Sequence, residues 1–226
     1  MSKVNKFISE VTNEDCMEGM ARYPDKYFDL AIVDPPYGIG MSKGIFSSNK
    51  EKNITSKRNY ISKDWDTAIP DKKYFTELQR VSKNQIIWGG NYMIEFLYNT
   101  SCFIVWDKKS NDVSNFADAE IAWTSFKTAI RLFKYDWIGF GYLNNPQKEK
   151  KIHPTQKPVA LYKWLLSNYA KQGDKILDTH LGSGSSRIAA YEMGFDFTAF
   201  ELDTEYFEAQ EKRYKAHIAQ LKLELV

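Results

Sequence analysis

A stiff tetrapeptide with chemically useful groups follows the apolar run Phe28–Val33; it consists of Asp34, Pro35, Pro36 and Tyr37. A six-residue apolar run that ends in prolines is typical of a buried strand, because proline cannot continue the hydrogen-bond ladder. The two prolines stiffen the turn, so it can present a carboxylate, a backbone carbonyl and an aromatic face in a fixed relation. An open α/β sheet binds its ligands at this end of a strand. A rigid start of a loop is the alternative interpretation.

A second candidate site follows the short run Lys175–Asp178. Gly182 and Gly184 would let a ligand approach the backbone of this turn closely. Glu201 stands 23 residues after Asp178, at the end of the next apolar run, where a carboxylate suits the hydroxyls of a ribose. The turn has neither a full G-x-G-x-x-G pattern nor the Lys-Ser/Thr of a phosphate loop, so ATP hydrolysis is not indicated. A plain α/β turn with an exposed glutamate is the alternative.

The elements that must position these residues alternate between strands and helices. Apolar runs predict strands at 28–33, 85–88, 102–106, 119–124, 175–178 and 195–200, and residues 119–124 alternate as an antiparallel strand does. Helical spacing predicts helices at 71–81, 91–98, 158–170, 186–193 and 204–223. This order predicts an α/β fold with an open, mostly parallel, doubly wound sheet. With 226 residues, we expect a single domain over 1–226.

Composition argues against several classes of protein. The two cysteines, Cys16 and Cys102, are too few for a disulfide framework or a four-ligand zinc site, and the three histidines add no metal-ligand spacing. No apolar run approaches the ~18 residues of a membrane span, and the N-terminal residues lack the apolar core of a secretory signal. We therefore expect a cytoplasmic protein with no metal and no membrane partner.

Positive charge gathers in two segments, although the net charge of the chain is only +2. Residues 38–63 hold six basic residues and one acidic residue, and residues 148–157 hold four lysines and one glutamate. A surface that binds a polyanion requires such a distribution, whereas simple solubility is the alternative. Residues 38–66 also show little periodicity, which predicts a flexible basic loop with a function.

Four motifs, taken in their order, resemble the amino-group DNA methyltransferases, which transfer a methyl group from S-adenosyl-L-methionine (SAM) to adenine N6 or cytosine N4. The motifs are D-P-P-Y at 34–37, H-P-T-Q-K-P at 153–158, D-x-x-x-G-S-G at 178–184 and F-E-L-D-T-E-Y-F-E-A-Q-E-K-R at 200–213. The resemblance covers nearly the whole chain. The D-P-P-Y half precedes the cofactor half, as in the circularly permuted beta class, and the resemblance implies a Rossmann-like methyltransferase fold.

The resemblance implies a SAM site in which Asp15 binds the adenine amino group, Glu201 binds the ribose, and Thr155 and Lys157 bind the methionine carboxylate. The full cofactor set is Asp15, Cys16, Thr155, Lys157, Asp178, His180, Gly182, Ser183, Gly184, Glu201 and Leu202. Two alternatives stay open: Asp15 as a helix N-cap, and Lys157 as a solvated lysine. The family more often has Pro at 179 and Phe at 180, so His180 either packs flat against SAM or is a satisfied turn histidine.

The resemblance also assigns the catalytic turn, Asp34, Pro35, Pro36 and Tyr37. Asp34 and the Pro35 carbonyl would each accept an N–H of the target amino group, and Tyr37 would stack on the base after it is flipped out of the duplex. Asp rather than Ser at position 34 favours adenine N6. The alternatives are cytosine N4, methylation of RNA or protein, and a DNA-binding paralogue without turnover.

The implied macromolecular partner is double-stranded DNA. Candidate phosphate contacts in the basic loop are Lys50, Lys52, Lys57 and Arg58. Residues 125–152 leave only a short target-recognition segment, which favours a homodimer that grips the duplex with two subunits. Aromatic residues in the helix predicted at 91–98 would lie at or near the dimer interface, and filling the core under the sheet is their alternative role. A place in a restriction–modification system follows from the same resemblance.

Overall fold

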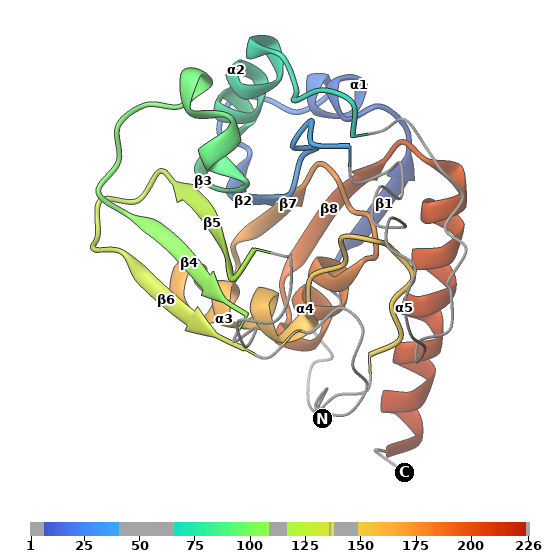
Figure 1. Ribbon diagram of the computed structural model, residues 1–226. Coiled ribbons are helices and arrows are strands. Elements are labelled where there is room, and N and C mark those ends of the chain that lie inside the picture. The colour runs from blue at the N-terminus through green and yellow to red at the C-terminus, as the bar shows by residue number, and fades with distance from the viewer. Residues whose placement is uncertain (1–6, 41–65, 109–116, 136, 138–148, 225–226) are drawn as a thin grey trace, which may run out of the picture.

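The structure of the protein is a computed structural model that describes residues 7–40, 66–108, 117–135, 137 and 149–224. One sheet of eight strands runs through this part of the chain (Figure 1). The strand order across the sheet is β1-β8-β7-β2-β3-β5-β4-β6. The strands are β1 (Ser9–Asn13), β2 (Phe28–Val33), β3 (Ser82–Trp88), β4 (Phe103–Asp107), β5 (Ala119–Thr124), β6 (Arg131–Lys134), β7 (Lys175–Asp178) and β8 (Asp196–Glu201).

The sheet is mostly parallel, as the sequence predicts. Strands β1, β8, β7, β2 and β3 all run in one direction. Strand β5 is antiparallel to both β3 and β4, which confirms the prediction for residues 119–124. Among the described strands, the first in sequence pairs with the last, with Val11 opposite Ala199, so β1 and β8 lie side by side in the sheet.

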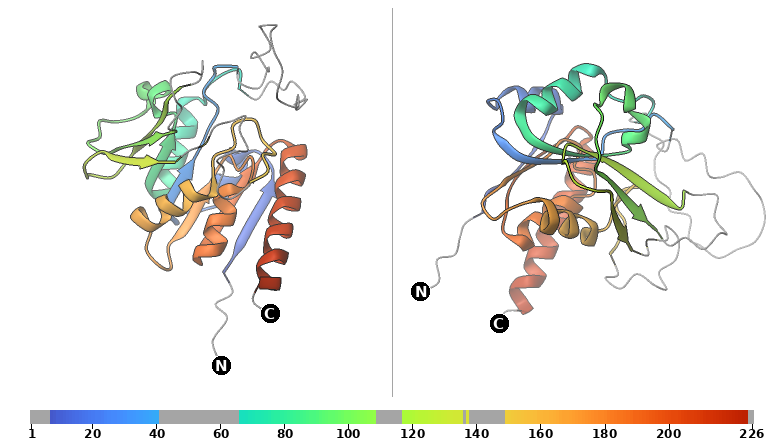
Figure 2. Two further views of the ribbon diagram at one scale, coloured as in Figure 1. Left: turned by 60° about the horizontal axis from the view of Figure 1, so that its bottom comes forward. Right: turned by 90° about the vertical axis from the view of Figure 1, so that its left-hand side faces the viewer.

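Helices cover both faces of the sheet, so the fold is doubly wound (Figure 2). Helices α1 (Cys16–Ala21) and α2 (Lys72–Val81) lie on one face. Helices α3 (Val159–Tyr169), α4 (Ser185–Met193) and α5 (Thr204–Glu224) lie on the other. Among the described helices, none combines the length and the apolar character needed to cross a membrane.

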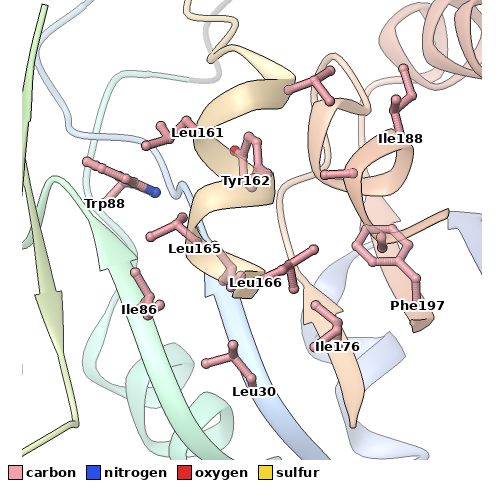
Figure 3. Packing of buried hydrophobic residues seen from close by; sticks show 14 of the residues in the cluster. Leu30, Ile86, Trp88, Leu161, Tyr162, Leu165, Leu166, Ile176, Ile188 and Phe197 are labelled. Atoms are coloured by element: carbon pink, nitrogen blue, oxygen red, sulfur yellow. The ribbon is translucent and has the colours of Figure 1, made fainter. Parts of the chain in front are cut away.

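The core under α3 shows why the strands are nearly continuous apolar runs. Leu161 and Leu165 of α3 are fully buried, and Figure 3 shows them packed over Ile86, Trp88 and Leu30 of the central strands. Side chains alternate between the faces of a strand. Buried helices on both faces therefore demand apolar residues at successive positions of β2 and β3.

The prediction of a helix at 91–98 is wrong, because two short 3₁₀ turns, η2 (Gly90–Tyr92) and η3 (Ile94–Phe96), occupy this segment. Gly89 adopts φ 67° directly before them, and Met93 between them has φ −123°, which interrupts helical hydrogen bonding. Strands β1 and β6 were not predicted from apolar runs. Both form the outer edges of the sheet and are only partly buried, so their sequences lack a strong apolar signal.

The packing under α3 predicts the effect of a cavity. Leu165→Ala should lower the free energy of unfolding by about 2–5 kcal/mol, because the helix cannot collapse into the space that the side chain leaves. Leu132→Ala is the matched control, since Leu132 is 52% exposed on edge strand β6. Urea titration of both variants measures the difference, and equal stabilities would contradict this description of the core.

Candidate active site

The carboxyl ends of five neighbouring parallel strands share one edge of the sheet. From β7 the chain proceeds outward to β8, whereas from β2 it proceeds in the opposite direction to β3. The gap between β7 and β2 is therefore the topological switch point, where open α/β sheets bind ligands. Asp178 ends β7 and Asp34 directly follows β2, so the fold brings the two predicted sites together.

The glycine turn after β7 is fastened to the end of β8. Gly182 has φ 52° and Gly184 has φ 72°, a region that residues with a Cβ atom rarely adopt. The backbone N–H of Gly182 donates to Glu201 Oε2 at 2.7 Å, and that of Asp203 donates to Oε1 at 2.9 Å. The buried Glu201 carboxylate thus fixes the turn in place at the site.

Asp178 lies under the same turn. Its Oδ1 accepts the His180 backbone N–H at 3.1 Å, and its Oδ2 accepts the Ser186 hydroxyl at 2.6 Å. Burial raises the pKa of Asp178 to about 7, and these two hydrogen bonds only partly oppose the rise. The carboxyl group can therefore change its protonation state near neutral pH.

The two departures from the family pattern, Thr179 and His180, form a hydrogen bond through their side chains. Thr179 Oγ1 lies 2.9 Å from His180 Nδ1 and 2.7 Å from the Tyr74 hydroxyl. Burial lowers the pKa of His180 to about 4, so the ring is neutral at physiological pH. These contacts support the alternative of a satisfied turn histidine, and packing against a cofactor stays a prediction.

The remaining predicted cofactor residues at this edge come from the ends of β1 and β8. Asp15 caps α1, because its side chain accepts the Met17 backbone N–H at 2.7 Å, which confirms the N-cap alternative. Burial raises the pKa of the Cys16 thiol to about 12, so Cys16 is no thiolate nucleophile. Leu202 is 68% exposed beside Glu201 and presents an apolar surface.

Residues 153–158 lie against the glycine turn. The Thr155 hydroxyl lies 3.1 Å from His153 Nδ1, and a Cβ atom at Gly182 would lie 3.7 Å from the His153 ring. Ser183 is buried, and its carbonyl accepts a hydrogen bond from Arg213 at 2.7 Å. The His153 ring thus lies near both the Thr155 hydroxyl and Gly182, and a contact of Thr155 with the methionine carboxylate stays a prediction.

The Asp34 carboxylate is bound by two side chains. Tyr37 donates its hydroxyl to Asp34 Oδ1 at 2.6 Å, and Lys157 donates its ammonium to Oδ2 at 2.5 Å. Lys157 is only 4% exposed, so the alternative of a solvated lysine is wrong. Lys157 Nζ also lies 3.1 Å from Glu120 Oε2. The observed partners of Lys157 are thus two carboxylates of the chain itself, and its contact with a methionine carboxylate stays a prediction.

These charges have opposing effects on Asp34. Burial raises the pKa of Asp34 above its ordinary value, Lys157 lowers it, and Glu120 raises it again, with a net rise. Burial alone would lower the pKa of Lys157, but Asp34 and Glu120 raise it on balance. Lys157 therefore stays an ammonium, whereas Asp34 is the group of the pair that can take up a proton.

Sequence reasoning missed Asp66, which shapes the proline turn at 34–37. Its Oδ1 accepts the backbone N–H groups of Tyr37 and Gly38, both at 2.8 Å. Tyr37 is held further by Tyr92, whose ring stacks on it with centroids 5.2 Å apart, and a Cβ atom at Gly89 would collide with the Tyr37 ring at 2.2 Å. An aspartate that follows Asp64 at the end of a basic segment gave no pattern that could identify Asp66.

Arg213 and Glu120 were also missed. Arg213 binds Ser183 O, Ser185 Oγ and, at 2.8 Å, Glu149, so it joins helix α5 to the glycine turn. Glu120 faces the buried side of β5 together with Ala122, and this charged residue in an alternating strand is a signal that could have identified it.

Several predicted sites lie outside the described residues. Lys50, Lys52, Lys57 and Arg58 of the basic loop are among them, as is most of 136–148 in the predicted target-recognition segment. Within the described part of the chain, no group of three or more His, Cys, Asp and Glu residues is arranged to hold a metal ion.

Comparison with known proteins identifies the family. The family model N6_N4_Mtase, described as DNA methylase, matches residues 72–212, more than half of the chain. The chain belongs to this family. The sequence of this DNA methylase is 25% identical to that of the type II methyltransferase M.HinfI of Haemophilus influenzae, over 94% of this chain and 70% of that protein. It is 24% identical to M2.MboI of Moraxella bovis, over 88% of this chain and 85% of that protein.

Solved structures share the fold of this DNA methylase. The M1.HpyAVI-SAM complex matches with a TM-score of 0.57 at 18% identity, over 91% of this chain and all of that one. The cytosine-N4-specific PvuII DNA methyltransferase matches with a TM-score of 0.59 at 14% identity, over 92% of this chain and 87% of that one. The predicted α/β architecture is confirmed.

The raised pKa of Asp178 predicts how the stability of the DNA methylase depends on pH. The folded protein keeps this proton up to pH about 7, whereas an unfolded chain releases it near pH ~4. The contribution of this proton to the free energy of unfolding is therefore complete below the pKa that Asp178 has in the unfolded chain. It is lost as the pH rises through the pKa that Asp178 has in the folded protein.

Asp178→Asn cannot ionise. The unfolding free energy of the wild type minus that of the variant should fall between pH ~4 and ~7, by at most about 1.4 kcal/mol per pH unit. Chemical denaturation across this range measures the difference. A difference that does not change with pH would show that folding does not shift the pKa of the Asp178 carboxyl group.

Proposed function

We propose that this DNA methylase transfers a methyl group from SAM to the exocyclic N6 of an adenine that is flipped out of DNA. The observation that carries the proposal is the position of Asp34: a carboxylate that is only 16% exposed at the topological switch point, beside the glycine turn and Asp178. The amino group of a target base, bound at the end of β2, and a cofactor, bound at the ends of β7 and β8, would meet there.

The chemistry of the residues at this edge fits SAM. Glu201 offers carboxylate oxygens for a ribose diol, since each carboxylate has about four acceptor positions and two backbone N–H groups occupy only part of them. Asp178 offers a carboxyl group whose ionised form a methionine ammonium would stabilise, and the backbone of Gly182–Gly184 allows close approach. Leu202 and the neutral ring of His180 offer apolar surface. The M1.HpyAVI-SAM complex, which has the same fold, supports this choice of cofactor.

The chain's own residues would orient and stabilise the attacking amino group. Asp34 and the Pro35 carbonyl would each accept one N–H, which directs the nitrogen lone pair away from the ring plane. SAM supplies an electrophilic methyl group on a sulfonium. Asp34 would stabilise the positive charge that develops on nitrogen and accept the surplus proton or pass it to water. Alignment of the two reactants would account for much of the acceleration.

Two observations bear on the choice of base and polymer. Asp at position 34 favours adenine, and the fold likeness to the cytosine-N4-specific PvuII enzyme keeps cytosine N4 as the second candidate. The family supports DNA over RNA or protein. Asp34 and Lys157 are both present and in contact, which argues against a paralogue without turnover.

The stacking role of Tyr37 stays part of the proposal, with one addition. Tyr92 already stacks on Tyr37 and is 46% exposed, so the site presents two aromatic rings rather than one. A flipped base would stack on this pair or take the place of Tyr92.

The partner proposals rest on the sequence alone. Double-stranded DNA would be held through Lys50, Lys52, Lys57 and Arg58. A homodimer remains a proposal, and the aromatic residues expected at its interface contact their own chain: Tyr92 stacks on Tyr37, Phe96 stacks on Phe75, and Tyr98 packs on Trp123. The type II relatives agree with a role in a restriction–modification system.

Asp34→Ala should abolish methyl transfer, because the target amino group loses its charged acceptor. SAM binding should stay within about tenfold of the wild type, equivalent to about 1.4 kcal/mol, since no contact to the cofactor is assigned to Asp34. Transfer of a labelled methyl group to DNA and calorimetric titration with SAM measure the two effects. Asp25→Ala, with a side chain that is 77% exposed, is the control. Near-normal turnover of the Asp34 variant would refute the mechanism.

Glu201→Ala should weaken SAM binding by about 1–3 kcal/mol, the cost of leaving hydroxyl partners unsatisfied. Part of this effect would come from the freed Gly182 N–H, so Glu201→Gln, which keeps an acceptor oxygen, should bind SAM with intermediate affinity. Calorimetric titration measures both variants. An unchanged SAM dissociation constant would remove Glu201 from the cofactor site.

A further inference from the structure

Glu120 is a carboxylate with no part in the mechanism proposed above; its side chain is 23% exposed, but its Oε2 atom is buried. It lies on strand β5, opposite Trp106 of β4, and faces the side of the sheet that α3 covers. Its Oε1 lies 2.5 Å from Lys108 Nζ and its Oε2 lies 3.1 Å from Lys157 Nζ. Asp34 continues β2 on this same face, since Leu30 and Ile32, four and two positions earlier, belong to the same core.

Lys157 stands between the two carboxylates. Its side chain is 3% exposed, and its ammonium lies 2.5 Å from Asp34 and 3.1 Å from Glu120. A buried ammonium without a partner is costly, because removal from water is repaid only by close opposite charge. When Asp34 turns to a target amino group, Lys157 needs a second anion, and Glu120 is the anion that it already contacts.

The two carboxyl groups differ in proton affinity. Burial raises the pKa of Asp34, and Lys157 does not fully offset it. Burial alone would also raise the pKa of Glu120, but Lys157 and Lys108 together hold it at about 2. Two carboxyl groups whose environments separate their pKa values take different roles. Glu120 is therefore ionised at neutral pH, and Asp34 is the one that can exchange a proton.

We propose that Glu120 is a positioning residue for methyl transfer: it retains the Lys157 ammonium while Asp34 exchanges Lys157 for the amino group of the target base. Lys108 in turn holds Glu120 in place. This inference rests on the proposed function, because it assumes that Asp34 accepts from the target.

Glu120→Gln tests the role, with Glu208→Gln on the exposed side of α5 as the charge-matched control. Without the Glu120 charge, Lys157 stays bound to Asp34 and competes with the target base. We expect kcat to fall roughly 10- to 100-fold, as for a small misplacement of a reacting group. The KM for DNA and the SAM dissociation constant should change by less than about threefold, since no contact to the DNA backbone or to SAM is assigned to Glu120. The control should match the wild type.

Lys108→Gln provides a second, independent variant. It should lower kcat by a smaller factor, and it should have no further effect in the Glu120→Gln background, because Lys108 acts only through Glu120. Thermal unfolding of each variant separates loss of fold from loss of turnover. If Glu120→Gln does not fold, the kcat of folded Lys108→Gln decides the question.

The outcomes distinguish this inference from the proposed function. A wild-type protein that transfers no methyl group to DNA would refute the proposed function itself. An active wild type with unchanged kcat in folded Glu120→Gln, or in folded Lys108→Gln where the first variant fails, would overturn only the role of Glu120. A rise in KM with kcat unchanged would also overturn it, because Glu120 would then serve binding rather than the transfer step.

Discussion

The site depends on the ion pairs that the buried ammonium of Lys157 forms with two carboxylates. This ammonium connects Asp34 at the end of β2, Glu120 on β5 and the segment that leads into α3. These three parts are distant in sequence, and the ion pairs form only when the sheet is assembled in its observed order. Burying these charges is costly, so the carboxylates must be held at close range. A rigid scaffold of strands and stiff turns supplies that precision.

In the proposed function, the same edge of the sheet would serve both reactants, because five parallel strands end there. The glycine turn, Asp178 and Glu201 form the half that suits a cofactor. The proline turn, held by Asp66 and packed against Gly89, forms the half that suits a planar amino group. Asp178 ends β7 and Asp34 directly follows the neighbouring strand β2, so in the proposed function the fold itself would set the approach of the methyl donor to the acceptor.

The sequence predicts what is encoded locally and misses what depends on distant neighbours. The strands β2, β7 and β8 are predictable because helices on both faces require apolar residues at successive positions. The edge strands β1 and β6 carry a weaker apolar signal, and the segment after Gly89 forms 3₁₀ turns because its backbone fits against Tyr37 and Trp123. Asp66 and Lys108 act through partners that no sequence spacing reveals. Glu120 could have been found, because a glutamate on the buried side of an alternating strand needs a partner.

The central claim is that Asp34 accepts the amino group of adenine. Its most direct test is to incubate the protein with unmethylated DNA and SAM that carries a labelled methyl group, then digest the DNA to nucleosides and identify the labelled one. The account predicts N6-methyladenine, with no label in DNA treated with the Asp34→Ala variant. Label in N4-methylcytosine, or DNA that acquires no label from the wild-type protein, would contradict it.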